Sequence, residues 1–252
     1  MTGQTTDAED AAQDALTIGS ARALRICAAL VLLTTVIYAV LFARLGLRGP
    51  VAEQLRSIAA ERALFVAMSS ADLMLHGCLF ALLLLLGLAL PAPGGRSRHR
   101  ELVGLALASG FFLPALVIHA TQATWIPRLV ALGTPMALEQ AALWYFLNPD
   151  SLPHAWEAGL CAPAAIGYWL IGAAHLDSPS PQRGLGISLL ALGLFSALAP
   201  VGYVSGSPTM ELIGMLGSVI PTVALAGFAL RRGTLLARSK DAPAAAQKEP
   251  AT

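Results

Sequence analysis

The two residues best suited to acid–base chemistry lie one helical turn apart in a stretch that is otherwise apolar. Residues 68–78 read MSSADLMLHGC, with Asp72 and His76 four positions apart. At this spacing the two side chains share one face of a helix. Ionisable side chains inside membrane-spanning helices are costly, and they mark functional positions or groups paired within the bundle. Asp72 and His76 are therefore the first candidate site residues.

Three roles fit this pair. It could lock its helix against neighbouring helices through an ion pair or a hydrogen bond. It could titrate protons or contact a substrate in a cavity open to the outside. Asp72 and His76 could also share a metal ion, with His119 or Glu157 completing the ligand set. No HExxH motif or comparably spaced cluster supports a metal, so we assign no metal site from the sequence.

Further polar side chains interrupt the other apolar stretches. His119 and Gln122 lie one turn apart in one stretch, and Glu157 lies near the start of the next. His99 and His175 lie in or beside short loops and are predicted to be surface histidines. The candidate catalytic residues, for an enzyme, are Asp72, His76 and Glu157, and the candidate substrate-binding residues are His119, Gln122, Tyr203 and Glu211.

The composition places these residues in a membrane protein. Of the 252 residues, 56% are hydrophobic and 12% are charged, whereas soluble domains carry about 25% charged residues. The net charge of +1 and the lack of a basic domain indicate no nucleic-acid partner. The chain has no phosphate-binding loop, no dinucleotide-binding glycine motif and no nucleophile elbow, and we predict no cofactor.

Six stretches are long and apolar enough to cross a bilayer as helices, which takes about 20 residues each. They cover residues 24–45, 64–90, 102–124, 156–176, 184–204 and 209–230. The sequence thus predicts an all-α bundle of six transmembrane helices.

The positive charges favour an orientation with both termini in the cytoplasm. With six spans, this orientation places eleven of the sixteen Lys and Arg residues on the inner side and five on the outer side, as the positive-inside tendency requires. A seventh span at 129–147 would reverse that ratio. We therefore predict that residues 129–147 and 50–63 form two interfacial helices on the outer side, with Trp144 and Tyr145 at headgroup level.

The two ends of the chain differ in composition from the bundle. Residues 1–21 are acidic and polar, and residues 233–252 are charged and rich in alanine and proline. We expect both to be disordered cytoplasmic tails, which leaves residues 22–232 as the transmembrane domain.

Two segments of the chain resemble a known group of proteins. These are IAAERALFVAMSSADLMLHGCLFALLLLLGLAL, which runs into a short basic loop, and the later GLGISLLALGLFSALAPVGY. The layout over residues 24–232 is similar to that of bacterial six-pass membrane proteins grouped as domain of unknown function 4386. The resemblance implies a six-helix bundle in the bacterial cytoplasmic membrane. It implies no activity and assigns no catalytic residue.

Depth along the helices suggests where a site lies. At a rise of 1.5 Å per residue, Asp72 is roughly 13 Å and His76 roughly 20 Å from the outer end of their helix, and the other ionisable candidates lie near outer ends. We expect a polar-lined pocket in the outer half that binds or transports a hydrophobic or amphiphilic small molecule.

Two other classes of function fit the same residues. One is a membrane-embedded acid–base enzyme acting on a lipid or isoprenoid-like substrate, with a desolvated Asp72 or Glu157 as general acid and His76 or His119 as its partner. The other is a structural subunit of a membrane complex. The partner that the sequence itself indicates is the lipid bilayer. The sequence does not indicate an oligomeric state.

Overall fold

The structure, a computed structural model, describes residues 4–47, 50–89, 96–145, 147–177 and 182–246, and these residues form helices joined by short turns. Three helices are short: α2 (Val51–Ala60), α5 (Ile126–Leu132) and α6 (Pro135–Trp144). The long helices are α1 (Gln4–Leu45), α3 (Arg62–Ala89), α4 (Arg96–Thr124), α7 (Leu152–Leu176), α8 (Arg183–Ser205) and α9 (Pro208–Ala246). The prediction of an all-α fold is confirmed.

Six segments are long and apolar enough to span a membrane, as the sequence predicts. The third runs from Arg96 to Leu132 and so includes α5, which follows α4 after a break at Trp125. The other five are Gly19–Leu45, Arg62–Leu88, Leu152–Leu176, Arg183–Ser205 and Thr209–Ala237.

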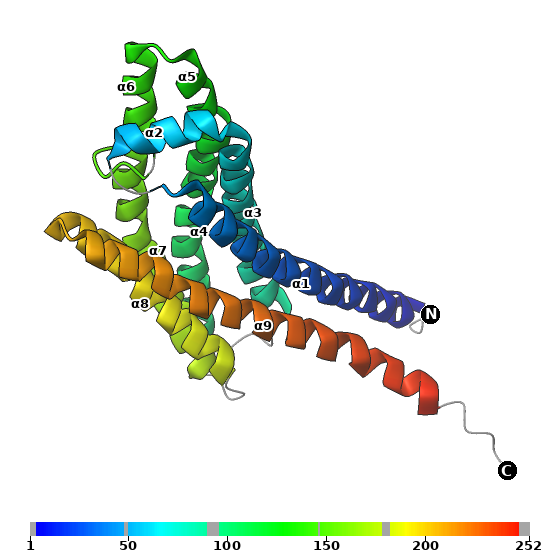
Figure 1. Cartoon of the computed structure of the whole chain (residues 1–252). Helices are drawn as coiled ribbons and strands as arrows, with labels where there is room; N and C mark the ends of the chain where they lie inside the picture. Colours follow the sequence, from blue (N-terminus) through cyan, green and yellow to red (C-terminus); the bar gives the residue numbers. More distant parts are fainter. Residues whose placement is uncertain (1–3, 48–49, 90–95, 146, 178–181, 247–252) are drawn as a thin grey trace.

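The spanning helices form a closed ring in chain order. α3 lies between α1 and α4, α7 lies between α4 and α8, and α9 contacts both α8 and α1. In Figure 1, α1 and α9 run side by side and extend together beyond the bundle, toward the two ends of the chain. An even number of spans returns the chain to the side on which it started. That this side is the cytoplasm remains a prediction from the charge count.

Glycines allow the closest helix contacts in the ring. A methyl group added at Gly104 of α4 would lie 2.6 Å from the carbonyl oxygen of Gly167 on α7, and one added at Gly172 would lie 2.9 Å from the carbonyl oxygen of Gly186 on α8. Small residues at helix crossings are the usual means by which membrane helices approach closely, because lipid supplies no hydrophobic force between them. The spacing of α4, α7 and α8 is therefore fixed by residues without side chains.

The short helices cover one end of the bundle, where a second apolar core forms (Figure 1). We call α2, α5, α6 and the residues packed beneath them the cap. Ile58 of α2, Phe65 of α3, Ile126 of α5 and Tyr145, directly after α6, are fully buried in it. The cap thus joins the ends of the spanning helices to the short ones through a continuous core.

Two details of the predicted outer helices are wrong. Residues 129–147 do not form one helix, because the chain turns at Gly133 in a left-handed conformation (φ +64°) that glycine adopts without a steric penalty. Tyr145 is fully buried, and its hydroxyl donates a hydrogen bond of 2.8 Å to Oε1 of Gln54 on α2. It therefore does not present its ring to lipid headgroups, whereas Trp144 is partly exposed. That the short helices lie at the interface remains a prediction.

The helices at both ends of the chain extend beyond the predicted transmembrane domain. α1 begins at Gln4, and α9 continues to Ala246, so helix covers most of the residues for which we predicted tails. Residues 1–3 and 247–252 lie outside the described residues.

The stability of the cap is expected to fall in alkaline solution. Burial raises the pKa of the Tyr145 hydroxyl well above its usual range. Below the pKa of an unfolded tyrosine, about 10, the folded and unfolded chains hold this proton equally. Above it only the folded chain keeps the proton, so stability falls with pH by up to about 1.4 kcal/mol per pH unit.

Tyr145→Phe removes this titration. Melting temperatures in detergent between pH 8 and about 11.5 should decline less steeply for the variant than for the parent chain, the remaining tyrosines being common to both. Parallel declines would show that Tyr145 ionises as readily in the folded protein as in the unfolded one.

Candidate functional site

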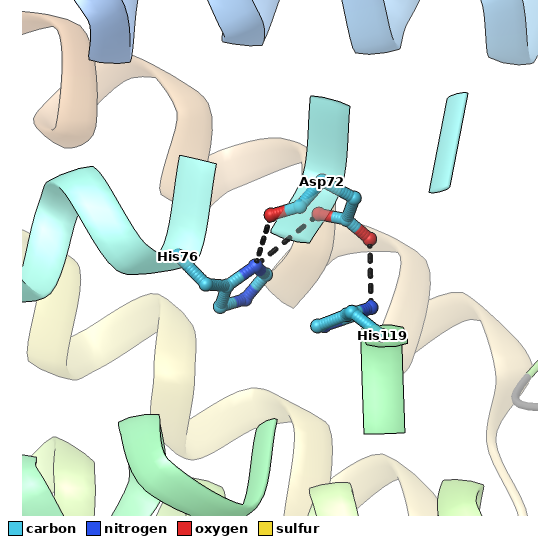
Figure 2. A group of neighbouring side chains, drawn as sticks. All are labelled: Asp72, His76 and His119. Atoms are coloured by element: carbon cyan, nitrogen blue, oxygen red, sulfur yellow. Dashed lines mark hydrogen bonds and ion pairs between the residues drawn. The ribbon is translucent and has the colours of Figure 1, made fainter. Parts of the chain in front are cut away.

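Three ionisable side chains from two helices meet inside the bundle, and we call them the Asp–His–His cluster (Figure 2). The Asp72 carboxylate lies between two imidazoles: Oδ1 is 3.3 Å from Nδ1 of His76, and Oδ2 is 3.0 Å from Nδ1 of His119. Nδ1 of His76 also lies 3.0 Å from the backbone carbonyl oxygen of Asp72. One carboxylate thereby orients both rings.

Packing of α3 against α4 brings these residues together. Asp72 and His76 share one face of α3, as their spacing predicts, and this face contacts α4. His119 lies on the buried face of α4 with Phe112 and Ala115. The helices run in opposite directions, so residues near the start of α3 and the end of α4 meet at the same level. This level is the half of the bundle nearest the cap.

Aromatic rings enclose the cluster. The imidazoles of His76 and His119 stack with centroids 4.4 Å apart, and His76 also contacts the rings of Phe111 and Phe112 at 6.0 and 6.5 Å. Asp72 is 5% exposed and His119 is 1% exposed. A carboxylate this far from water is stable only when it is paired or hydrogen-bonded, and the two imidazoles supply those interactions.

Glu157 approaches the same region from α7. It is partly buried and interacts electrostatically with His76 and with Tyr38 of α1. The structure therefore places a second carboxylate near the cluster without a direct ion pair to it among the described contacts. The predicted grouping of Glu157 with Asp72 and His76 is compatible with this position.

Gln122 has a different environment from His119, although the two lie one turn apart. Its side chain is fully buried and donates a hydrogen bond of 2.7 Å from Nε2 to the carbonyl oxygen of Trp144, the last residue of α6. This bond fastens α4 to the cap. Gln122, a candidate substrate-binding residue, thus has a structural partner.

Tyr203 and Glu211 belong to another group of polar side chains. Oε2 of Glu211 on α9 is 3.1 Å from Nε2 of His154 on α7, and the Tyr203 ring of α8 lies 5.7 Å from the His154 ring. All three residues are partly or substantially exposed. The structure therefore separates Tyr203 and Glu211 from the Asp–His–His cluster, and it places Gln122 at the cap.

One buried ionic group was not predicted as a site. Glu101 of α4 accepts a hydrogen bond of 2.6 Å from Nη1 of Arg98, and its other oxygen lies 3.5 Å from Nε2 of His175 on α7. The prediction that His175 is a surface histidine is wrong, since it is 2% exposed, whereas His99 is exposed. The spacing of Arg98 and Glu101 is a helical ion-pair signal, but it says nothing of His175.

One cavity beside α4 does not open onto the Asp–His–His cluster. It is an apolar groove of about 410 Å³ between α4, α6 and α7. It occupies the opposite face of α4 from His119. The groove is lined by Leu113, Pro114, Val117, Ile118, Thr121, Trp144, Leu152, Pro153 and Trp156.

These features define a class of protein: a multi-pass membrane protein in which six spanning helices form a ring closed at one end by short helices. Comparison with models of known protein families, with curated proteins and with solved structures gives no match. The resemblance to the group of unknown function 4386 therefore remains a prediction.

Proposed function

We propose that the protein binds or carries a hydrophobic or amphiphilic molecule whose apolar part occupies the groove between α4, α6 and α7. The observation that carries this proposal is the groove itself. Its volume of about 410 Å³ lies within the range of small-molecule sites, roughly 300–1,000 Å³. Its walls are almost wholly aliphatic and aromatic, so they suit an acyl or isoprenoid chain.

Tryptophans at the cap end of the groove support an amphiphile rather than a pure hydrocarbon. Trp144 and Trp156 both line the groove and both keep exposed surface. Indole rings favour the headgroup level of a bilayer, where an apolar ring and a polar N–H are both satisfied. A bound molecule with its chain along α4 would thus have its polar end at these rings.

The enzyme alternative needs access to the Asp–His–His cluster. Its general acid would be Asp72 or Glu157 and its partner His76 or His119. Asp72 and His119 are almost fully buried, and His76 is the cluster member with the most exposed side chain, at 18%. A substrate would have to reach the cluster past His76. The groove needs no such opening, and for this reason we favour binding or transport over catalysis.

Retention of lipid by the purified protein tests the proposal. Val117, which lines the groove and is 67% exposed, is replaced by phenylalanine to fill it. Ile220→Phe on α9, at a similarly exposed apolar position (75%), is the matched control. Native mass spectrometry after release from lipid nanodiscs should show one retained amphiphile on the parent chain and on Ile220→Phe, and a several-fold loss on Val117→Phe.

Lipid that merely coats the outer surface would respond equally to both substitutions. Equal retention by Val117→Phe and Ile220→Phe would therefore refute specific binding in the groove. Quenching of tryptophan fluorescence by brominated lipid gives an independent measurement, because Trp144 and Trp156 line this site.

A further inference from the structure

We infer that the Asp–His–His cluster is a site for a divalent transition-metal ion of the Zn²⁺ type. Its ligands would be the Asp72 carboxylate, one imidazole nitrogen of His76 and one of His119. This inference does not depend on the proposed lipid groove, which lies on the other face of α4.

The spacing of the donor atoms fits a shared ion. One ligand atom from each of the three residues lies within 4.8 Å of the other two. Two atoms bound to a tetrahedral ion at about 2.1 Å lie roughly 3.4 Å apart. The two Asp72 oxygens lie 3.3 Å from the His76 ring nitrogen and 3.0 Å from that of His119, one oxygen to each ring, which is close to that value.

The types of donor select the class of ion. Imidazole nitrogen with a single carboxylate oxygen suits Zn²⁺ and the neighbouring first-row metals. Ca²⁺ and Mg²⁺ prefer six or more oxygen ligands, and the cluster supplies too few. Three protein ligands leave one position of a tetrahedral ion open, as in sites where the metal exchanges or activates a bound molecule.

The charges around the cluster also suit a dication. With both imidazoles neutral, one Zn²⁺ and the Asp72 carboxylate leave a single net positive charge. Glu157, which interacts electrostatically with His76, would offset part of this charge. Neutrality matters here because an uncompensated charge is costly in a low-dielectric interior.

A buried hydroxyl lies beside the ligands on α3. Ser69 precedes Asp72 by three residues, so it occupies the same helix face. It is 2% exposed, and its Oγ has no hydrogen-bond partner among the described residues. The α3 face that carries two of the ligands thus also carries a buried hydroxyl without a partner among the described residues.

The scaffold is rigid enough to hold the donors in place. Two of the ligands lie one turn apart on α3, and the third lies on α4, which packs directly against it. Phe111 and Phe112 contact the His76 ring, and the hydrogen bond of Gln122 to the cap fixes the end of α4 next to His119. Ligands on packed helices lose little freedom when a metal binds.

Titration of the full chain with Co²⁺ in detergent tests the site. The chain is purified without a histidine tag and stripped with chelator. We expect one Co²⁺ per chain with visible d–d absorption of a tetrahedral site, displaced by Zn²⁺. Zn²⁺ at about a hundredfold excess over its Kd should raise the Tm by about 5 °C or more.

Variants separate this site from adventitious binding. His119→Gln and Asp72→Asn should weaken Co²⁺ affinity by more than a hundredfold. His154→Gln and Glu211→Gln, in the other His–carboxylate pair, should leave it unchanged. Should a buried substitution prevent folding, His76→Gln at the most exposed ligand serves instead. No tetrahedral spectrum on the folded parent chain, or equal affinity in the ligand and control variants, would overturn the inference.

Discussion

Replacing Gly104 by leucine is expected to prevent the native packing of α4 against α7 and to destabilise the protein strongly. Even the first added carbon would lie 2.6 Å from the carbonyl oxygen of Gly167 and 2.7 Å from Cγ1 of Ile171. Side chains rotate away from such contacts, but a backbone carbonyl moves only if the helix moves. We expect a loss of about 3 kcal/mol or more.

The control for this substitution lies on the same helix. Gly110 has no atom within 4 Å of a methyl group added to it, so Gly110→Leu exposes more apolar surface to lipid without a clash. Gly104→Leu should lose monodisperse protein in size-exclusion chromatography and show a much lower Tm in detergent, whereas Gly110→Leu should match the parent chain. Equal behaviour of the two variants would mean that α4 and α7 do not approach this closely.

Loss of the buried Glu101 carboxylate is expected to have a large effect as well. Glu101 lies between Arg98 and His175, and its side chain is 1% exposed. Removing one member of a buried ion pair leaves the others with uncompensated polar groups, at a typical cost of about 3 kcal/mol. Glu101→Ala should therefore lower the Tm strongly, although Arg98 retains contact with water and limits the loss.

A second ion pair of the same length supplies the control. Nη1 of Arg100 also lies 2.6 Å from a carboxylate oxygen, that of Asp177, but this carboxylate side chain is 58% exposed. Exposed pairs contribute about 0–1 kcal/mol, so Asp177→Ala should hardly change the Tm. If the two alanine variants lose equal stability, burial is not what makes Glu101 important.

The sequence predicts the membrane spans well because spanning depends on properties local to each segment. Whether a segment spans a bilayer depends on its own length and apolar content, and for this reason all six spans are predicted, although three of them extend five to eight residues beyond the predicted bounds at one or both ends. The break at Gly133 depends on one residue with a left-handed conformation, within a stretch whose composition otherwise favours a continuous helix.

Predicting the candidate site requires both the local sequence pattern and the contacts between helices. The spacing of Asp72 and His76 places them on one face of α3, and this is a local property. That His119 completes the cluster, while Gln122 on the same helix bonds to the cap, depends on which helices are neighbours. The burial of His175 against Glu101 has the same origin, since a residue near a loop is buried only if another helix covers it.

The sequence by itself determined the class of protein, the number of spanning helices and the helix faces that carry polar groups, because hydropathy and helical periodicity are properties of each segment alone. The tertiary structure decided that Asp72 pairs with two histidines, that Tyr203 and Glu211 lie in a separate group, and that the apolar groove beside α4 faces away from the cluster. These are contacts between segments, and many pairings of six similar apolar helices satisfy the same hydropathy pattern. The glycine crossings and buried ion pairs of this chain select one of them.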